Sequence, residues 1–154
     1  MKLCPKLFRK VFMKNMMEIK FKAVPENEAF ARTVAATFLL QMNPTLEQIE
    51  DVKTAVSEAV TNSIVHAYPN KQGWVTMKMG IKDNEIHISV IDNGIGIVDI
   101  KKALSPFYTS KPEQERSGMG FTVIEAFMDE LKVSNNKEGL TVYMTKKIDN
   151  AEVC

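Results

Sequence analysis

Apolar and polar residues alternate along the segment 17–23, and a period of two is typical of a half-buried β-strand. Met17, Ile19 and Phe21 would face the core, while the glutamate and lysine residues between them would face solvent. Pro25 follows the segment, and proline cannot donate a backbone hydrogen bond to a sheet. The pattern therefore predicts one strand that ends before Pro25.

Two segments with a helical period come next. Between residues 26 and 42 large apolar side chains recur every four positions, which predicts a helix that stops before Pro44. Its apolar stripe would consist of Phe30, Val34, Phe38 and Met42. A second helix is predicted from Thr45, which forms a capping box with Gln48, to about His66. Its core face would consist of Leu46, Ile49, Val52, Val56 and Val60.

The second half of the chain returns to strands. Residues 75–82 and 86–92 alternate as the first strand does, and the turn-prone pair Asp83-Asn84 between them predicts a β-hairpin. A polar irregular loop, a helix and two short strands are then predicted over residues 97–117, 118–131, 132–134 and 141–147. The loop is long enough to be a functional lid. This order of elements predicts an α+β fold with a mixed, mainly antiparallel sheet and helices on one face.

Composition is that of a soluble, globular, single-domain protein. The 154 residues are 45% hydrophobic and 25% charged, enough to bury a core without disulfide or metal staples. A net charge of +1 lacks the basic excess of a nucleic-acid binder, and no apolar run is long enough to span a bilayer. The only cysteines, Cys4 and Cys154, have no partners at metal-ligand spacing, which disfavours zinc and fits a reducing cytoplasm.

The first twelve residues differ from the rest of the chain in charge. They carry four basic side chains and no acidic one, so the remainder has a net charge of −3. We expect residues 1–12 to be a disordered leader, either a start-site extension or an added segment. A weak membrane-surface or partner-binding arm is the alternative. The domain is predicted over residues 13–148, followed by a C-terminal tail at residues 149–154.

Two polar residues interrupt the apolar face of the second predicted helix. Glu58 and Asn62 are four positions apart, so their side chains point the same way. A carboxylate here could act as a general base, and an amide oxygen could be a ligand for Mg²⁺. The alternative is a helix edge that faces water, as most charged residues on helices do.

An acid and two glycines end the second hairpin strand, at Asp92, Gly94 and Gly96. A carboxylate can accept a hydrogen bond from an exocyclic amine such as that of adenine. Glycines let the backbone approach a flat ring or a phosphate. A plain glycine-rich turn is the alternative.

A second glycine-rich segment, residues 116–121, opens the helix after the loop. Free N–H groups at a helix N-terminus bind phosphate, and Arg116 could clamp a terminal phosphate with two donors. The alternative is a flexible helix entry. The sequence has no Walker-type P-loop and no convincing Ser/His/Asp arrangement, and His87 is expected in a structural role on the outward face of a strand.

The order and spacing of these motifs resemble the ATP-binding domain of the GHKL superfamily, the Bergerat fold. The matching elements are Glu58-x-x-x-Asn62, Asp92-x-Gly94-x-Gly96, the lid and Gly118-x-Gly120. The segments 57–64, 107–113 and 115–122 narrow the resemblance to the anti-sigma F factors of spore-forming bacilli, a family of serine kinases. The resemblance covers about residues 13–148 and implies a two-layer α/β sandwich that binds ATP or ADP with Mg²⁺.

The resemblance also implies a role for each matching residue. Glu58 would be the general base for a serine hydroxyl, and Asn62 would hold Mg²⁺. Asp92 would recognise the adenine amino group with support from Thr141, and Arg116 would touch the terminal phosphate. Further nucleotide contacts are implied for His66, Gly94, Gly96, Thr109, Lys111, Ser117, Gly118, Met119, Gly120 and Phe121. One departure is Leu140, where relatives often have threonine.

The partners implied by the resemblance are proteins. A homodimer would inhibit the sporulation sigma factor F and phosphorylate an anti-anti-sigma factor on serine, in the cytoplasm, without contacting nucleic acid or a membrane. The first strand has an open edge through which the domain could pair, and we expect Arg32 to help bind the sigma factor.

Three other functions remain open. The chain could be a nucleotide-gated sigma-binding module with little catalysis, although Glu58 disfavours this because a binder needs no base. It could be a kinase for a related stress-response sigma factor. It could also be a catalytic fragment of a histidine kinase, but it has no convincing phosphoacceptor histidine.

Overall fold

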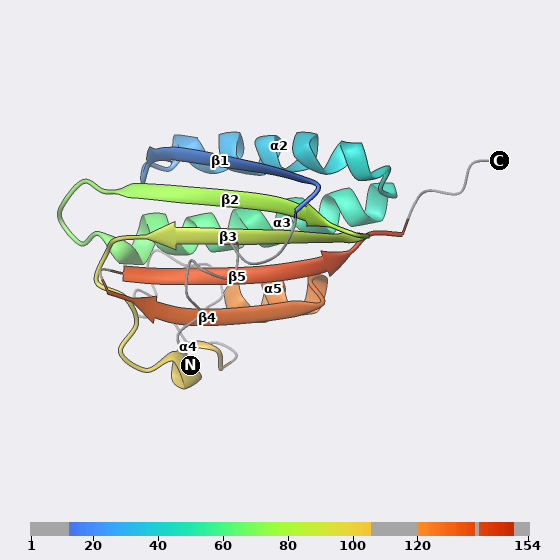
Figure 1. Ribbon diagram of the computed structural model, residues 1–154. Coiled ribbons are helices and arrows are strands. Elements are labelled where there is room, and N and C mark those ends of the chain that lie inside the picture. Colours follow the sequence, from blue (N-terminus) through green and yellow to red (C-terminus); the bar gives the residue numbers. More distant parts are fainter. Residues whose placement is uncertain (1–12, 106–119, 138, 150–154) are drawn as a thin grey trace.

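A single antiparallel sheet carries the helices on one face (Figure 1). The computed structural model describes residues 13–105, 120–137 and 139–149. The strands follow the order β1-β2-β3-β5-β4, with bounds Asn15–Lys22, Trp74–Lys82, Glu85–Asp92, Gly139–Lys147 and Glu130–Asn136 in that order. The helices are α2 (Glu26–Leu39), α3 (Leu46–Asn62), α4 (Ile100–Ala103) and α5 (Gly120–Phe127).

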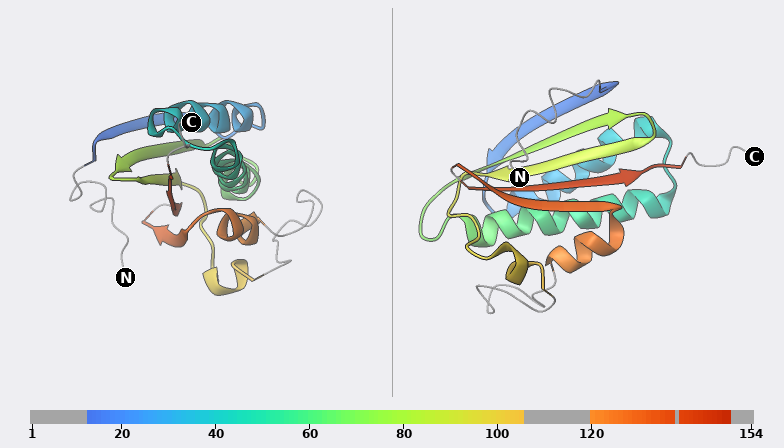
Figure 2. Two further views of the ribbon diagram at one scale, coloured as in Figure 1. Left: turned by 90° about the vertical axis from the view of Figure 1, so that its right-hand side faces the viewer. Right: turned by 60° about the horizontal axis from the view of Figure 1, so that its bottom comes forward.

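These pairings confirm the α+β fold and make the sheet more regular than expected. Every strand pair in the described part of the chain is antiparallel. The end-on view in Figure 2 shows α2, α3 and α5 gathered on the same side of the sheet. Two layers thus enclose one core, whose fully buried members include Val56, Val60, Met77, Ile88 and Ile124.

The capping box predicted for the second long helix is present. The side-chain oxygen of Thr45 accepts a hydrogen bond from the Gln48 backbone N–H at 3.2 Å, and the Gln48 side chain accepts one from the Thr45 N–H at 3.0 Å. Helix α3 begins directly after this cap and continues beyond Asn62 as a π-helical segment, Ser63–Ala67. The helix therefore ends close to the predicted boundary at His66, but with a wider last turn.

The buried faces of the two long helices differ from the predicted stripes. In α2 the buried residues are Ala31, Ala35 and Leu39, whereas Phe30 is about half exposed. In α3 Leu46 is almost fully exposed, because it is the first residue after the cap. Alanines let α2 approach α3 closely, so the larger residues of the stripe lie at the border of the interface.

Two further boundaries were predicted wrongly. Helix α5 ends at Phe127, and Leu131, assigned to that helix from its spacing, lies in β4 opposite Met144. The segment 97–117 was expected to be irregular, but its described part contains the short helix α4, capped by the Asp99 side chain. No helix of the described residues is long and apolar enough to cross a membrane.

Candidate functional site

Asp92 is a buried carboxylate at the end of β3. It is only 3% exposed and lies on the helix-covered face of the sheet, between Val75 of β2 and Leu140 of β5. Its Oδ2 accepts a hydrogen bond from the Ser63 hydroxyl at 3.0 Å. Its Oδ1 accepts bonds from the backbone N–H groups of Gly94 at 3.0 Å and Leu140 at 3.3 Å. Three donors therefore fix the orientation of this carboxylate.

The burial of Asp92 changes its acidity. Desolvation raises the pKa of its carboxyl above the ordinary value of 3.8, and the hydrogen bonds from Gly94, Ser63 and Leu140 lower it in part. A carboxylate buried in this way gains from a further donor, because burial deprives it of water. The exocyclic amine of a purine is a donor of that kind.

The glycine-rich turn after Asp92 is shaped by packing within the protein. A Cβ on Gly94 would lie 2.1 Å from the carbonyl oxygen of Ala67, and that oxygen accepts the Ile95 N–H at 2.9 Å. Gly96 has a φ of +70°, a left-handed conformation that glycine adopts without strain. The turn is thus held against the π-helical end of α3, next to Ser63 and Asp92.

Glu58 and Asn62 meet the first residue of α5. A Cβ on Gly120 would lie 3.1 Å from Oδ1 of Asn62 and 3.3 Å from Oε2 of Glu58. Both side chains therefore converge on the N-terminus of α5, where backbone N–H groups have no partner within the helix. This arrangement places a carboxylate that can accept a proton beside a helix N-terminus that can bind a phosphate.

The amide of Asn62 has spare hydrogen-bonding capacity. Its Nδ2 is buried and has no hydrogen-bond partner among the described residues, and such orphaned polar atoms are rare in folded proteins. An amide supplies one hard oxygen ligand, and Mg²⁺ in phosphoryl-transfer sites commonly takes one or two protein ligands beside water and phosphate. The orphaned Nδ2 is a donor and would suit an acceptor such as a phosphate oxygen, whereas Oδ1, which lies beside Gly120, is the one oxygen that could hold a magnesium ion arriving with a nucleotide.

Thr141 does not reach the Asp92 carboxylate. It is paired with Ile91, so it lies on the face of the sheet opposite to Asp92, and its hydroxyl accepts a bond from the Asn136 amide at 3.3 Å. Leu140 is the residue on the Asp92 face, and it contributes its backbone N–H. Leu140 has no side-chain hydroxyl to offer on this face, and Thr141 does not supply one there.

The other two predicted nucleotide-contact residues in the described range, His66 and Phe121, differ in how deeply they are buried. His66 lies half-buried in the π-helical segment, one turn beyond Asn62. Phe121 is buried in the core beneath the start of α5. Thr109, Lys111, Arg116, Ser117, Gly118 and Met119 lie outside the described residues.

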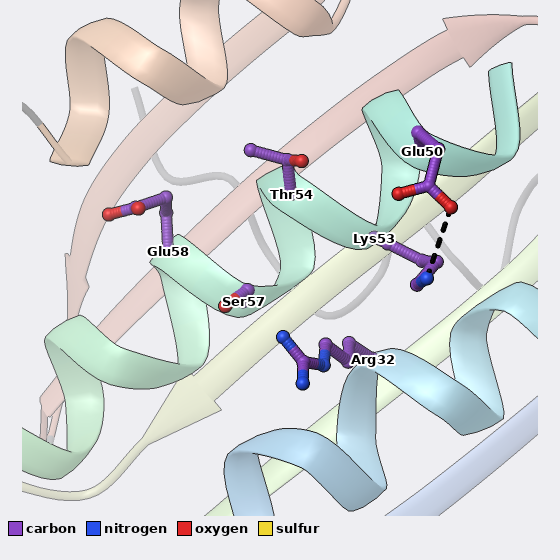
Figure 3. Close-up of a pocket in the computed structure, with 6 residues that line it drawn as sticks. All are labelled: Arg32, Glu50, Lys53, Thr54, Ser57 and Glu58. Carbon is purple, nitrogen blue, oxygen red and sulfur yellow. Dashed lines mark hydrogen bonds and ion pairs between the residues drawn. The ribbon is translucent and has the colours of Figure 1, made fainter. Parts of the chain in front are cut away.

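Arg32 lies beside the site, on α2. Arg32 and Glu58 both line a hollow of about 150 Å³, and Figure 3 shows Arg32 on α2 reaching toward α3, which carries Glu58. Arg32 forms an ion pair with Glu28 at 3.7 Å, and the Ser57 hydroxyl donates to that glutamate at 2.5 Å. Helix α3 contributes Glu58 to this hollow, and Ser63, the residue directly after α3, contacts Asp92 instead.

Sequence reasoning missed Ser63 and Asn135. Ser63 was overlooked because nothing in the sequence around it indicates that its hydroxyl will contact Asp92, 29 residues away. Asn135 binds the backbone of Ile97 through both ends of its amide, at 3.0 and 2.7 Å. Contacts between segments this far apart in the chain have no local pattern.

Comparison with known proteins identifies the family of the ATPase domain. A family model described as the histidine kinase-like ATPase domain matches residues 21–146, and the chain belongs to this family. Two solved structures share the fold. A catalytic domain of the histidine kinase ThkA has a TM-score of 0.56 at 15% identity, covering 86% of this chain and 96% of its own. The RsbU and RsbW domains of a Mycobacterium tuberculosis protein have a TM-score of 0.64 at 19% identity, covering 88% of this chain and 32% of theirs.

Curated relatives narrow this class to the anti-sigma F factors. The protein of that name from Clostridium acetobutylicum is 56% identical over 88% of this chain and 95% of its own length. The one from Oceanobacillus iheyensis is 51% identical over 91% of this chain and 97% of its own. The chain is a member of the anti-sigma F factor family, and its ATPase domain implies that it binds a nucleotide.

Proposed function

We propose that the protein is an anti-sigma factor and an ATP-dependent protein serine kinase. It binds and inhibits the sporulation sigma factor F and phosphorylates the anti-anti-sigma factor on serine. The observation that carries the proposal is the convergence of Glu58 and Asn62 on the N-terminus of α5, marked by Gly120. The identity of 56% with proteins named anti-sigma F factor supports the same conclusion.

The chemistry assigned to Glu58 is proton acceptance. Its carboxylate takes the proton of the attacking serine hydroxyl while the serine oxygen bonds to the γ-phosphorus of ATP. The bond from that phosphorus to the β–γ bridging oxygen breaks, and ADP leaves. The products are phosphoserine on the partner and a protonated Glu58, which returns its proton to solvent.

Nucleotide binding is assigned to the two ends of the site. Asp92 accepts a hydrogen bond from the adenine amine, and its three protein donors hold it in place for that contact. Asn62 would hold the Mg²⁺ that accompanies the phosphates, and this ion would neutralise charge on the transferred group. The N-terminal N–H groups of α5, with Arg116 and Gly118 beyond the described range, bind the terminal phosphates.

Partner binding is assigned to two surfaces. Arg32, at the rim of the hollow that Glu58 also lines, contacts the sigma factor. Strand β1 is at one end of the sheet order, so its outer edge can pair with a second copy to form a homodimer. The complex acts in the cytoplasm, where the sigma factor would otherwise bind RNA polymerase.

The test mixes the purified chain with each partner. With ATP and Mg²⁺ it should retain sigma factor F on a column, and on addition of the anti-anti-sigma factor it should transfer phosphate to a serine of that protein. A related stress-response sigma factor, added in the same assay, should be retained more weakly. Nucleotide and sigma binding without phosphate transfer would instead show a nucleotide-gated binding module.

A further inference from the structure

The amide of Asn135 clamps the turn that follows Asp92. Asn135 is in β4, close to the end of the strand, and its Oδ1 accepts the Ile97 backbone N–H at 3.0 Å. Its Nδ2 donates to the Ile97 carbonyl oxygen at 2.7 Å. One side chain thus makes the pair of bonds that a neighbouring strand would make. Ile97 itself is in neither a helix nor a strand.

The position of Asn135 ties this clamp to the buried carboxylate of Asp92. Asn135 is paired with Leu140, and Leu140 is paired with Asp92, so the three residues lie in a row across neighbouring strands. Directly opposite residues in an antiparallel sheet share a face. Asn135 therefore projects from the face that carries the buried carboxylate.

The far side of the turn is fixed by this clamp and by the partly buried side chain of Ile97, which packs against the core. On the near side, the Ile95 N–H binds the Ala67 carbonyl oxygen at 2.9 Å. Beyond that bond the chain passes through Gly96 in its left-handed conformation, and Ile95 and Val98 are exposed at 68% and 105%. Because glycine tolerates more backbone conformations than other residues, Gly96 lets the turn rearrange when the Asn135 clamp is removed.

We propose that Asn135 is a positioning residue for the nucleotide base, acting through the turn 94–97. The inference rests on nucleotide binding at Asp92 and not on kinase activity. Fixing Ile97 keeps Gly94 and Gly96 in the conformation that forms one wall of the base pocket. When the clamp is lost, only a fraction of molecules has the turn in place, and the apparent dissociation constant rises in inverse proportion to that fraction.

Three variants test this role with partners absent. Asn135→Ala removes both hydrogen bonds, and Asn135→Asp keeps the volume but replaces the donor with an oxygen that faces the Ile97 carbonyl. Asn27→Ala is the matched control, because Asn27 also donates its amide to a backbone carbonyl, that of Lys22 at 2.9 Å in β1, two strands away from β3. The binding of ATP and ADP with Mg²⁺ is measured by calorimetry, and hydrogen exchange reports the protection of the Ile97 amide.

Both Asn135 variants should bind ATP and ADP more weakly by the same factor, about five- to thirtyfold, since two hydrogen bonds hold the turn. Exchange at Ile97 should accelerate in both, while the thermal midpoint stays close to that of Asn27→Ala. Unchanged affinity in Asn135→Ala, or a loss confined to ATP, would overturn the positioning role. A wild-type chain that binds no nucleotide would instead refute the binding on which the role depends.

Discussion

The hydroxyl of Ser63 donates a hydrogen bond to the buried carboxylate of Asp92 over 3.0 Å. This bond joins the end of the helix that carries Glu58 and Asn62 to the end of the strand that carries the acid. The two ends of the proposed nucleotide site, one for the base and one for the phosphates, are therefore parts of one connected unit.

Asp92→Asn should weaken ATP and ADP binding about ten- to a hundredfold, because an amide is a poorer acceptor than a carboxylate. An asparagine side chain has only one oxygen, so at least one of the three groups that donate to Asp92 would lose its acceptor. Isothermal titration calorimetry measures the change. Asp83→Asn, in the β2–β3 turn, is the control, and equal affinity in both variants would remove the adenine role of Asp92.

The pH dependence of the free protein should also report Asp92. Because its pKa is raised in the folded state, the folded chain binds this proton more tightly than the unfolded chain does. The free energy of unfolding of the wild type, relative to Asp92→Asn, should therefore increase as the pH falls through the folded pKa and be level below 3.8. Nucleotide affinity should fall over the same range, since the carboxylate is its acceptor. Urea titrations and calorimetry at several pH values measure the two trends, and parallel stability curves for the two proteins would contradict them.

Gly120→Ala should slow phosphate transfer more than it affects folding. The new methyl group would lie 3.1 Å from Oδ1 of Asn62 and 3.3 Å from Oε2 of Glu58, so one of these side chains must move. The shift needed is only a few tenths of an ångström, and since a displacement of about 1 Å can reduce kcat about a hundredfold, we expect a loss of up to about tenfold. Alanine is a good helix former, so the thermal midpoint should be preserved. Glu125→Ala, on the exposed side of α5, is the control for steady-state kinetics, and full activity in Gly120→Ala would argue against the arrangement.

The stability of the fold should depend on a partly buried ion pair. Lys146 of β5 lies 3.3 Å from Asp51 of α3 and donates to the carbonyl oxygen of Phe127, the last residue of α5, at 2.7 Å. Removing either charge, by Lys146→Met or Asp51→Asn, should cost about 2 kcal/mol in the free energy of unfolding, because the remaining charge is left in a poorly solvated place.

The double variant should lose less than the sum of the two single variants. The exposed pair Lys53–Glu50, at 3.1 Å, is a matched control and should contribute under about 0.5 kcal/mol. Urea denaturation gives all of these values. Additive losses at Lys146 and Asp51 would show that the two side chains do not interact.

Periodicity predicted the elements well where the pattern was long. The capping box at Thr45 and the hairpin around Asp83-Asn84 depend on neighbours in the sequence, so they could be found without the structure. The helix faces were shifted, because small alanines such as Ala31 and Ala35 bury more completely than the large residues beside them.

The site was only partly predictable for a different reason. Glu58 and Asn62 were recognised from their spacing on one helix, but the bonds from Ser63 to Asp92 and from Asn135 to Ile97 join distant segments. Thr141 is the instructive case. The alternation along β5 places Leu140, Val142 and Met144 in the core. Because neighbouring residues of a strand face opposite sides, this pattern predicts that Thr141 lies on the other face of the sheet.

The central claim is that this chain is a serine kinase whose base is Glu58, and phosphate transfer tests it most directly. The purified chain, ATP, Mg²⁺ and the anti-anti-sigma factor are mixed, and the partner is analysed by mass spectrometry. We predict phosphoserine on the partner with the wild type and with Glu47→Gln, an exposed acid on the same helix. Glu58→Ala should bind ATP with unchanged affinity and form no phosphoserine. Phosphoserine formed at the wild-type rate by Glu58→Ala would contradict the assignment of the base, and its absence with the wild type would contradict the kinase.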